Sequence, residues 1–78
     1  MSRKNIVGLN VKKARQRRQP AMSQLQLSEN LASLDVQLDR AGVAKIETGI
    51  RRVFDFELAA LAKALGVSVN WLLKKPRR

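Results

Sequence analysis

This 78-residue chain has four residues of the kind that cap helix starts, and a short stretch follows each of them. In each stretch the apolar residues lie three or four positions apart, which is the spacing of a helix. The four capping residues are Ser23, Asp39, Asp55 and Ser68. An earlier stretch has the same apolar spacing at Val7, Val11 and Ala14. No stretch alternates apolar and polar residues as a half-buried strand would. The pattern therefore predicts an all-α fold of five short helices.

Proline or glycine follows the predicted helices, at Pro20, Gly49, Gly66 and Pro76. Ser23 and Gln26 have the spacing of a capping box, and the segment from Leu34 to Leu38 is interpreted as a connection. Helical spacing predicts a core made of Val7, Val11, Ala14, Leu27, Leu31, Leu34, Val43, Ile46, Ile50, Leu58, Leu61, Ala62 and Leu65. Trp71 is expected to cap this core, and Phe54 and Phe56 are expected to pack beside a helix start.

The excess of positive charge limits the classes of molecule that the chain is expected to bind. Sixteen Lys and Arg against six Asp and Glu give a net charge of +10, which favours nucleic acid or an acidic membrane surface. Without Cys or His, the chain cannot form disulfides, zinc sites with Cys or His ligands, or His-based acid–base catalysis. We therefore expect no enzyme, catalytic residue, metal or other cofactor, and no small-molecule ligand.

Three parts are distinguished along the chain: a basic arm at 1–5, one domain at 6–73 and a basic tail at 74–78. The opening stretch "MSRKNIVGLNVKK" has too short an apolar run for a signal peptide, and no later run reaches the length of a membrane span. The expectation is a cytoplasmic protein without a membrane partner.

Three stretches carry a resemblance to a known family: "MSQLQLSENLA", "VAKIETG" and "LAALAKALGVSVNWLL". Together they resemble the Cro/phage-repressor (Xre) family of helix-turn-helix DNA-binding domains, over about Val7 to Leu73. The resemblance implies a five-helix, lambda-repressor-like fold with the helix-turn-helix at the second and third helices. The turn from Leu34 to Leu38 is longer than usual and lacks glycine. A subset of the family has such a turn, followed by Asp-Arg and an R-x-V-x-D-x-E run, here at 39–40 and 51–57.

Family geometry assigns DNA contact to ten residues: Ser23, Gln24, Arg40, Ala41, Gly42, Ala44, Lys45, Thr48, Arg51 and Arg52. Gln24 matches a phosphate-contacting glutamine. Arg40 could fork onto guanine, and with Lys45 it must supply the hydrogen-bond readout, because the small residues between them have no polar side chains. The bare Gly42 has two open explanations: close packing on the preceding helix, or close approach to the groove wall.

Two further assignments follow from the same resemblance. Arg51 and Arg52 lie in a loop that family members place along the DNA backbone or point into the minor groove. Arg15 and Glu47 match positions that form a buried ion pair between the first helix and the recognition helix. Such a pair is costly to bury, so its value lies in orientation more than in stability.

The predicted function is sequence-specific binding of double-stranded DNA by a small transcriptional regulator, a bacterial or phage repressor associated with the nucleoid that acts by occupying its operator. A short reader makes few base contacts, so a two-fold homodimer on a palindromic site would gain affinity. Two alternatives stay open. One is an antitoxin-like regulator that also binds an acidic partner protein. The other is a basic RNA-binding or ribosome-associated protein.

Overall fold

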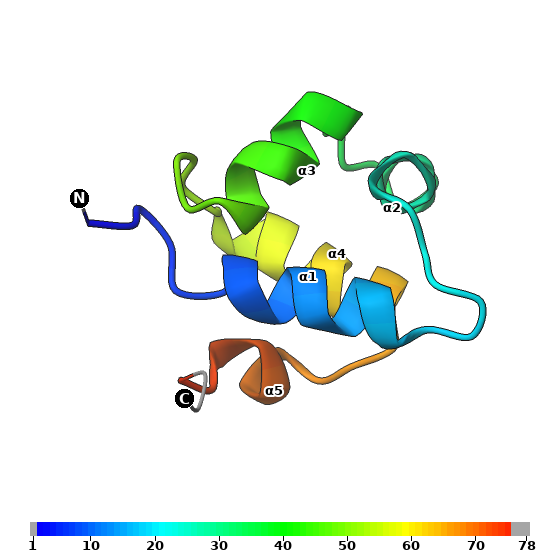
Figure 1. The fold of residues 1–78 in the computed structure, drawn as a ribbon. Helices are drawn as coiled ribbons and strands as arrows, with labels where there is room; N and C mark the ends of the chain where they lie inside the picture. Colours follow the sequence, from blue (N-terminus) through cyan, green and yellow to red (C-terminus); the bar gives the residue numbers. More distant parts are fainter. Residues whose placement is uncertain (1, 76–78) are drawn as a thin grey trace.

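Five α-helices and no β-strand make up residues 2–75, the part of the chain that the computed structural model describes. The helices are α1 (Gly8–Arg17), α2 (Gln24–Ala32), α3 (Arg40–Glu47), α4 (Asp55–Leu65) and α5 (Val69–Leu73). The prediction of an all-α, five-helix fold is confirmed. In Figure 1, α1 crosses in front of α4, α2 and α3 lie above this pair, and α5 lies below it. Contacts join α2 to α3 and join both of them to the α1–α4 layer.

Side-chain caps start three of the helices as predicted. The Ser23 hydroxyl accepts the Gln26 N–H at 3.0 Å, and the side-chain carbonyl of Gln26 accepts the Ser23 N–H at 2.8 Å, which completes the capping box. The Asp39 carboxylate accepts the Gly42 N–H at 2.7 Å at the start of α3. Ser68 caps α5 in the same way. Each cap satisfies backbone donors that the first helical turn leaves without an intrahelical partner.

The start of α4 differs from the prediction that Asp55 is its cap. Asp55 is the first helical residue, Phe54 holds the cap position, and the Asp55 carboxylate accepts the N–H of Phe56 at 2.7 Å. The carboxylate of Glu57, three residues after the cap position, reaches back to the Phe54 N–H at 3.0 Å. One acidic side chain inside the first turn thus replaces the expected cap, in a position that also suits the helix dipole.

Three helices end in the same hydrogen-bond motif, centred on Asp35, Gly49 and Gly66. These residues have φ of 63°, 82° and 70°. In each case the next N–H bonds to the carbonyl five residues earlier, at 2.9 to 3.0 Å, as in a Schellman motif. Aspartate tolerates this left-handed conformation better than most residues. Asp35 therefore does for the α2–α3 connection what glycine does at the other two ends.

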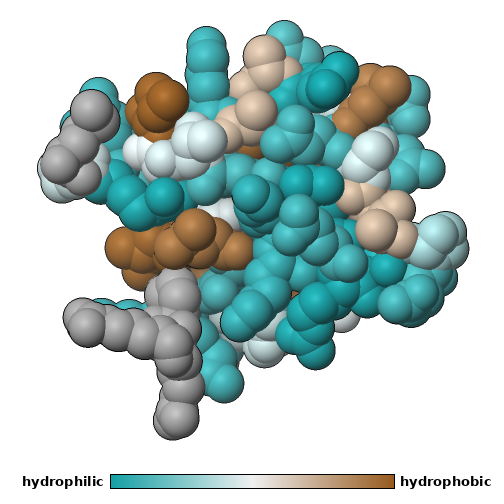
Figure 2. All heavy atoms as spheres, in the orientation of Figure 1, coloured by the Kyte–Doolittle hydropathy of each residue, from teal (hydrophilic) through white to brown (hydrophobic). Residues whose placement is uncertain are grey.

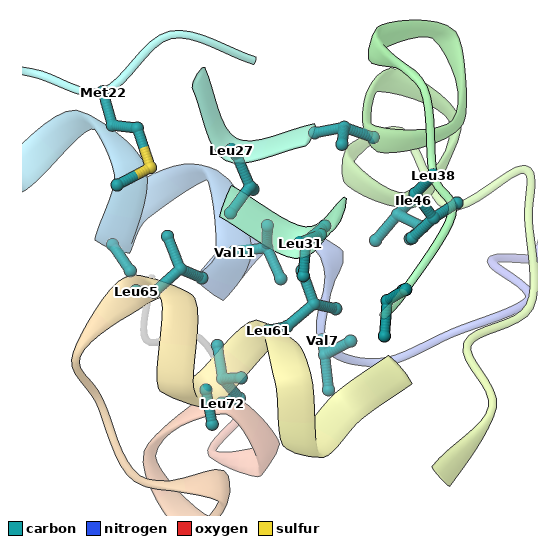
Figure 3. Packing of buried hydrophobic residues seen from close by; sticks show 14 residues of the cluster. Val7, Val11, Met22, Leu27, Leu31, Leu38, Ile46, Leu61, Leu65 and Leu72 are labelled. Carbon is teal, nitrogen blue, oxygen red and sulfur yellow. The ribbon is translucent and has the colours of Figure 1, made fainter. Parts of the chain in front are cut away.

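The core draws on all five helices and on the α2–α3 connection. Its largest fully buried side chains are Val11, Leu27, Leu31, Val43, Ile46, Leu61 and Leu72. Figure 3 shows the α2 leucines and Val11 converging on Leu61, with Leu38 of the connection beside Ile46. Burying a leucine or isoleucine stabilises the fold by about 1.5–3 kcal/mol. The buried seam therefore holds α3 and its inner face against the α1–α4 layer.

Several residues predicted to be core are not fully buried. Ile50 is 60% exposed, because the left-handed turn at Gly49 takes the chain out of the helix before it. Phe54 and Phe56, predicted to pack beside a helix start, stack on each other at the start of α4 but are 56% and 61% exposed and lie outside the core. Phe56 lies on the side of α4 opposite its buried leucines. Leu58 and Trp71 are half-buried and pack against the edge of the core, and Leu34 is half-buried in the α2–α3 connection.

Candidate nucleic-acid interface

Helix α3 has two distinct faces. Val43 and Ile46 are fully buried on its inner face, and Glu47 is nearly so. The outer face carries Arg40, Ala41, Ala44, Lys45 and Thr48, all exposed except the half-buried Ala44. At 3.6 residues per turn, Arg40 and Lys45 flank an arc of about 140°, with the alanines between them. In Figure 1 the helix lies along one edge of the molecule, and the exposure of these residues places the bare stripe and its two cationic borders at the surface.

A buried ion pair anchors the inner face of α3 to α1, as predicted. The guanidinium of Arg15 binds both carboxylate oxygens of Glu47, at 2.8 and 2.9 Å. The side chains are 11% and 3% exposed. Arg15 also donates to the carbonyl of Met22, just before α2. Two parallel bonds of this kind fix orientation as well as position, so the pair sets how α3 lies on the rest of the fold.

Gln24 belongs to the same network. Its side-chain amide donates to Glu47 Oε1 at 3.0 Å. The sequence prediction placed this side chain on a phosphate, whereas the structure shows it bound within the protein. An amide group has two hydrogens, so one remains that can be donated outward. Ser23, the neighbouring predicted DNA contact, is exposed and uses its hydroxyl as the cap of α2.

Gly42 packs against protein. A Cβ atom at this position would lie 2.8 Å from Leu38 Cδ2 and 3.2 Å from Asp39 Oδ1. Of the two explanations for this glycine, the structure therefore supports packing, although the neighbour is the connection before α3 and not α2 itself. Gly42 is half-buried and its missing side chain leaves room for Leu38, whereas its contact with DNA stays a prediction.

Thr48 lies at the end of the outer face, with its side chain exposed. Its hydroxyl donates to the carbonyl of Ala44 at 3.1 Å and approaches that of Lys45 at 3.3 Å. These bonds satisfy carbonyls in the last turn of α3. The hydroxyl oxygen is an acceptor as well, so an outer partner would have to donate to it.

The N-terminal arm lies against the C-terminal end of α3, and this contact was not predicted from the sequence. Arg3 Nη2 donates to the carbonyl of Glu47, and the Lys4 backbone N–H donates to the carbonyl of Gly49, each at 2.7 Å. The last carbonyls of a helix lack intrahelical donors and carry partial negative charge. Two donors from the basic arm therefore stabilise this end of α3.

Asn5 connects the arm, α1 and the chain after α3 through one side chain. Its amide donates to the carbonyls of Ile46 at 3.0 Å and Arg51 at 2.8 Å. Its carbonyl accepts the N–H groups of Val7 and Gly8, at 3.1 and 2.7 Å. An asparagine just before a predicted helix is a known capping signal, and it could have suggested the last two bonds. The first two depend on tertiary structure.

Arg51 was predicted to contact the DNA backbone, and its guanidinium is instead bound to Glu57. Two bonds of 2.8 Å join them, and the exposed fractions of the side chains are 28% and 5%. The hydrogen bonds from Arg51 keep the pKa of Glu57 below its ordinary value, against the effect of burial. The same bonds raise the pKa of Arg51. Arg52 is exposed, so of the two loop arginines it is the one placed for an outside partner.

Asn10 is a buried polar residue whose role was not predicted from the sequence. Its amide lies 3.0 Å from the carbonyl of Leu72 and 2.7 Å from that of Lys74, at the end of α5. It shares the inner face of α1 with Val11 and Ala14. A polar residue on a predicted apolar face was the signal for this role, because buried amides must find hydrogen-bond partners.

The two ion pairs also change the balance of charge at the surface. Glu47 and Glu57 are buried, which removes two of the six acidic residues from the surface. Lys12, Lys13 and Arg17 stay exposed on α1. In Figure 2 hydrophilic residues cover most of the visible face, and apolar residues form a few separate patches. Each pair removes one positive and one negative charge together, so the net charge of +10 is unchanged and fewer carboxylates remain at the surface to offset the exposed cations.

Within residues 2–75, no three His, Cys, Asp or Glu side chains are grouped so that they could hold a metal ion. In the same range, every helix is too short or too polar to cross a membrane. Compared with protein-family models, curated protein sequences and solved structures, the chain matched none of them.

Proposed function

We propose that the protein binds double-stranded DNA in a sequence-specific manner and acts as a small Xre-type transcriptional regulator that represses by occupying its operator. The observation that carries this proposal is the outer face of α3, where small residues lie between Arg40 and Lys45 on a helix at the edge of the molecule. Both cations are exposed, and the net charge of +10 supports a polyanionic partner.

A helix with such a face fits the major groove, which is about 12 Å wide and admits one α-helix. Ala41 and Ala44 allow the helix backbone to approach the base edges and can contact thymine methyl groups. Arg40 and Lys45 are separated by a rise of about 7.5 Å along the helix, which is about two base-pair steps. Arg40 in the first turn would fork onto guanine, and Lys45 would reach a second base or a phosphate.

The contacts within the protein define what the remaining predicted residues would do. Arg15 and Glu47 hold α3 in place, and Gln24 would donate its second amide hydrogen to a phosphate beside the start of α2. The exposed Arg52 and Lys12 would add phosphate contacts, which position the protein without reading sequence. Arg51 would contribute to DNA binding indirectly, because its bonds to Glu57 hold the loop after α3 in place.

The test is selection of bound sites from random duplex DNA, followed by measurement of two variants on the selected site and its single-base changes. Arg40→Ala should remove about 1–3 kcal/mol of discrimination at one base pair per half-site. Arg52→Ala is the matched control, and it should weaken binding to all these duplexes about equally.

Salt dependence provides a second readout of the same experiment. Each phosphate contact should contribute a slope of about −0.9 in log K against log salt. Arg52→Ala should reduce the slope by about one contact. Absence of any preferred duplex, or tighter binding to an RNA competitor, would contradict the proposal and favour an RNA-binding protein. Uniform weakening by Arg40→Ala would make that residue a phosphate contact.

A further inference from the structure

Phe54 and Phe56 are the most conspicuous apolar side chains away from α3. Both are more than half exposed, and their rings stack in parallel, with 6.1 Å between centroids and 2° between planes. Phe56 borders a groove between the α2–α3 connection and α4. This aromatic groove is lined by Leu34, Asp35, Val36, Phe56, Ala59, Ala60 and Lys63. Exposed apolar surface of this kind marks sites where another molecule binds.

Charges of both signs border the aromatic groove. Asp35 lies on the wall formed by the connection, and Lys63 lies on the wall formed by α4. Asp55, between the two phenylalanines in the chain, is exposed as well. The chain has a net charge of +10, so most of its surface repels a second copy. At this groove, each positive charge of one copy can face a negative charge of the other.

A second apolar groove provides the contrast. Ile6 and Leu73 are 67% and 40% exposed, and the charged residues that line this groove with them are Arg3, Lys4 and Arg52. All three charges are positive, so two copies that met here would repel each other. Like charges placed opposite each other in an interface weaken association. The aromatic groove is therefore the better surface for self-association.

We propose that the aromatic groove is the surface through which two copies of this chain form a two-fold dimer. In such a dimer the same patch serves both subunits. With the two-fold axis along the groove, the wall that carries Asp35 in one copy faces the wall that carries Lys63 in the other. Two equivalent ion pairs then flank the two Phe56 rings, each stacked on a Phe54 ring of its own copy, and this apolar surface leaves water.

The area of the patch sets the strength of this dimer. Phenylalanine side chains bury about 150–250 Å² each, so two rings that are a little over half exposed contribute on the order of 250 Å² per copy. A stable interface buries about 800 Å² per partner. The free protein should therefore dimerise weakly, and DNA with two half-sites should bring two copies together. This last step rests on the proposed function, whereas dimerisation itself does not.

Sedimentation equilibrium of the free protein tests the interface without DNA. At protein concentrations up to about 1 mM, in about 0.3 M salt to screen the net charge, the wild type should show reversible dimerisation. Phe54→Ser/Phe56→Ser should lower the association constant at least tenfold. Ile6→Ser, an equally exposed apolar residue in the basic groove, should leave it unchanged. Lys63→Glu should also weaken association, because the introduced carboxylate would face Asp35 of the other copy.

The second measurement uses the duplex selected above, with one half-site or two. Wild-type binding to two half-sites should be cooperative, with a coupling factor on the order of ten. Phe54→Ser/Phe56→Ser should abolish the coupling while affinity for one half-site stays unchanged. If the protein selects no duplex, the proposed function fails, and the sedimentation result still decides the interface.

Three results would overturn the proposal. In the first, the wild type stays monomeric and binds two half-sites independently. In the second, Ile6→Ser disrupts association and the phenylalanine variant does not. In the third, dimers form only with a different protein. Circular dichroism checks that each variant is folded. Should the double variant unfold, Lys63→Glu decides the question alone, and unchanged association in that variant would count against the interface.

Discussion

The two Arg–Glu pairs have nearly the same bond lengths and different roles, with Arg15 binding through Nε and Nη2 and Arg51 through Nη1 and Nη2. In each, a guanidinium makes two bonds of 2.8 to 2.9 Å to a carboxylate, and the carboxylate accepts one further N–H. For Glu47 the additional donor is the side chain of Gln24 in α2, and for Glu57 it is the backbone of Phe54 at the start of α4. The arginine side chain is 11% exposed in the first pair and 28% exposed in the second.

The two pairs differ most in the length of chain that they close. Arg15 and Glu47 are 32 residues apart and join α1 to α3, with α2 tied in through Gln24. Arg51 and Glu57 are six residues apart and shape one loop and one helix start. Closing the longer segment costs more chain entropy, so the first pair depends more on the packing of the helices that bring its two residues together. We expect the first pair to orient α3 and the second to hold the loop behind it.

Breaking the long-range pair should have the largest effect. Glu47→Ala leaves the guanidinium of Arg15 buried without its partner and removes the acceptor of Gln24. Loss of one partner from a buried pair costs about 3–5 kcal/mol, so the free energy of unfolding in urea should fall by that amount. Glu29→Ala, which removes an exposed carboxylate, is the control and should change stability by less than about 0.5 kcal/mol. Equal effects of the two variants would contradict the role given to this pair.

Breaking the local pair should cost less, since water reaches Arg51 more easily. Glu57→Gln should lower the free energy of unfolding by about 1.5–3 kcal/mol, the contribution of hydrogen bonds to a charged group. Thermal unfolding of this variant beside Glu47→Ala compares the two pairs directly. If the local variant is the more damaging one, the order proposed here is wrong.

The local pair also predicts a dependence on pH. Folding lowers the pKa of Glu57, because Arg51 donates two hydrogen bonds to its carboxylate. A proton therefore binds the unfolded chain more tightly, and the stabilisation from this group is complete above its ordinary pKa of 4.5 and lost as the pH falls below it. Urea unfolding between pH 7 and pH 3 should show a shallower loss of stability in Glu57→Gln than in the wild type. Parallel curves would exclude this contribution.

The smallest expected effect is that of Gln24→Ala. Glu47 keeps both bonds from Arg15 in this variant, so the loss is one hydrogen bond worth about 1 kcal/mol. Urea unfolding should show a much smaller loss of stability in Gln24→Ala than in Glu47→Ala. The double variant should be little less stable than Glu47→Ala, because both changes act on one network. Full additivity would mean that Gln24 stabilises the fold independently of Glu47.

Much of the fold follows from short-range patterns in the sequence. Ser23, Asp39 and Ser68 cap helices as predicted, and Gly49 and Gly66 end them. Each of these signals depends on backbone groups within a few residues, so the order of amino acids determines them before any distant contact forms. Apolar residues three or four positions apart likewise identify the inner face of a helix wherever that helix packs. The Arg15–Glu47 pair was also predicted, from the family resemblance and not from spacing.

Only the tertiary structure decided which polar side chains are occupied inside the protein. From the sequence, the Arg51 guanidinium was predicted to contact DNA, but in the structure it is bound to Glu57. Gln24 was likewise predicted to contact a phosphate, but its amide donates to Glu47 of α3. The four bonds of Asn5 need the start of α1 and the end of α3 in one place. The physical reason is that a hydrogen bond or an ion pair depends on distances of about 3 Å. For residues far apart in the chain, these distances are set by the packing of helices rather than by sequence spacing.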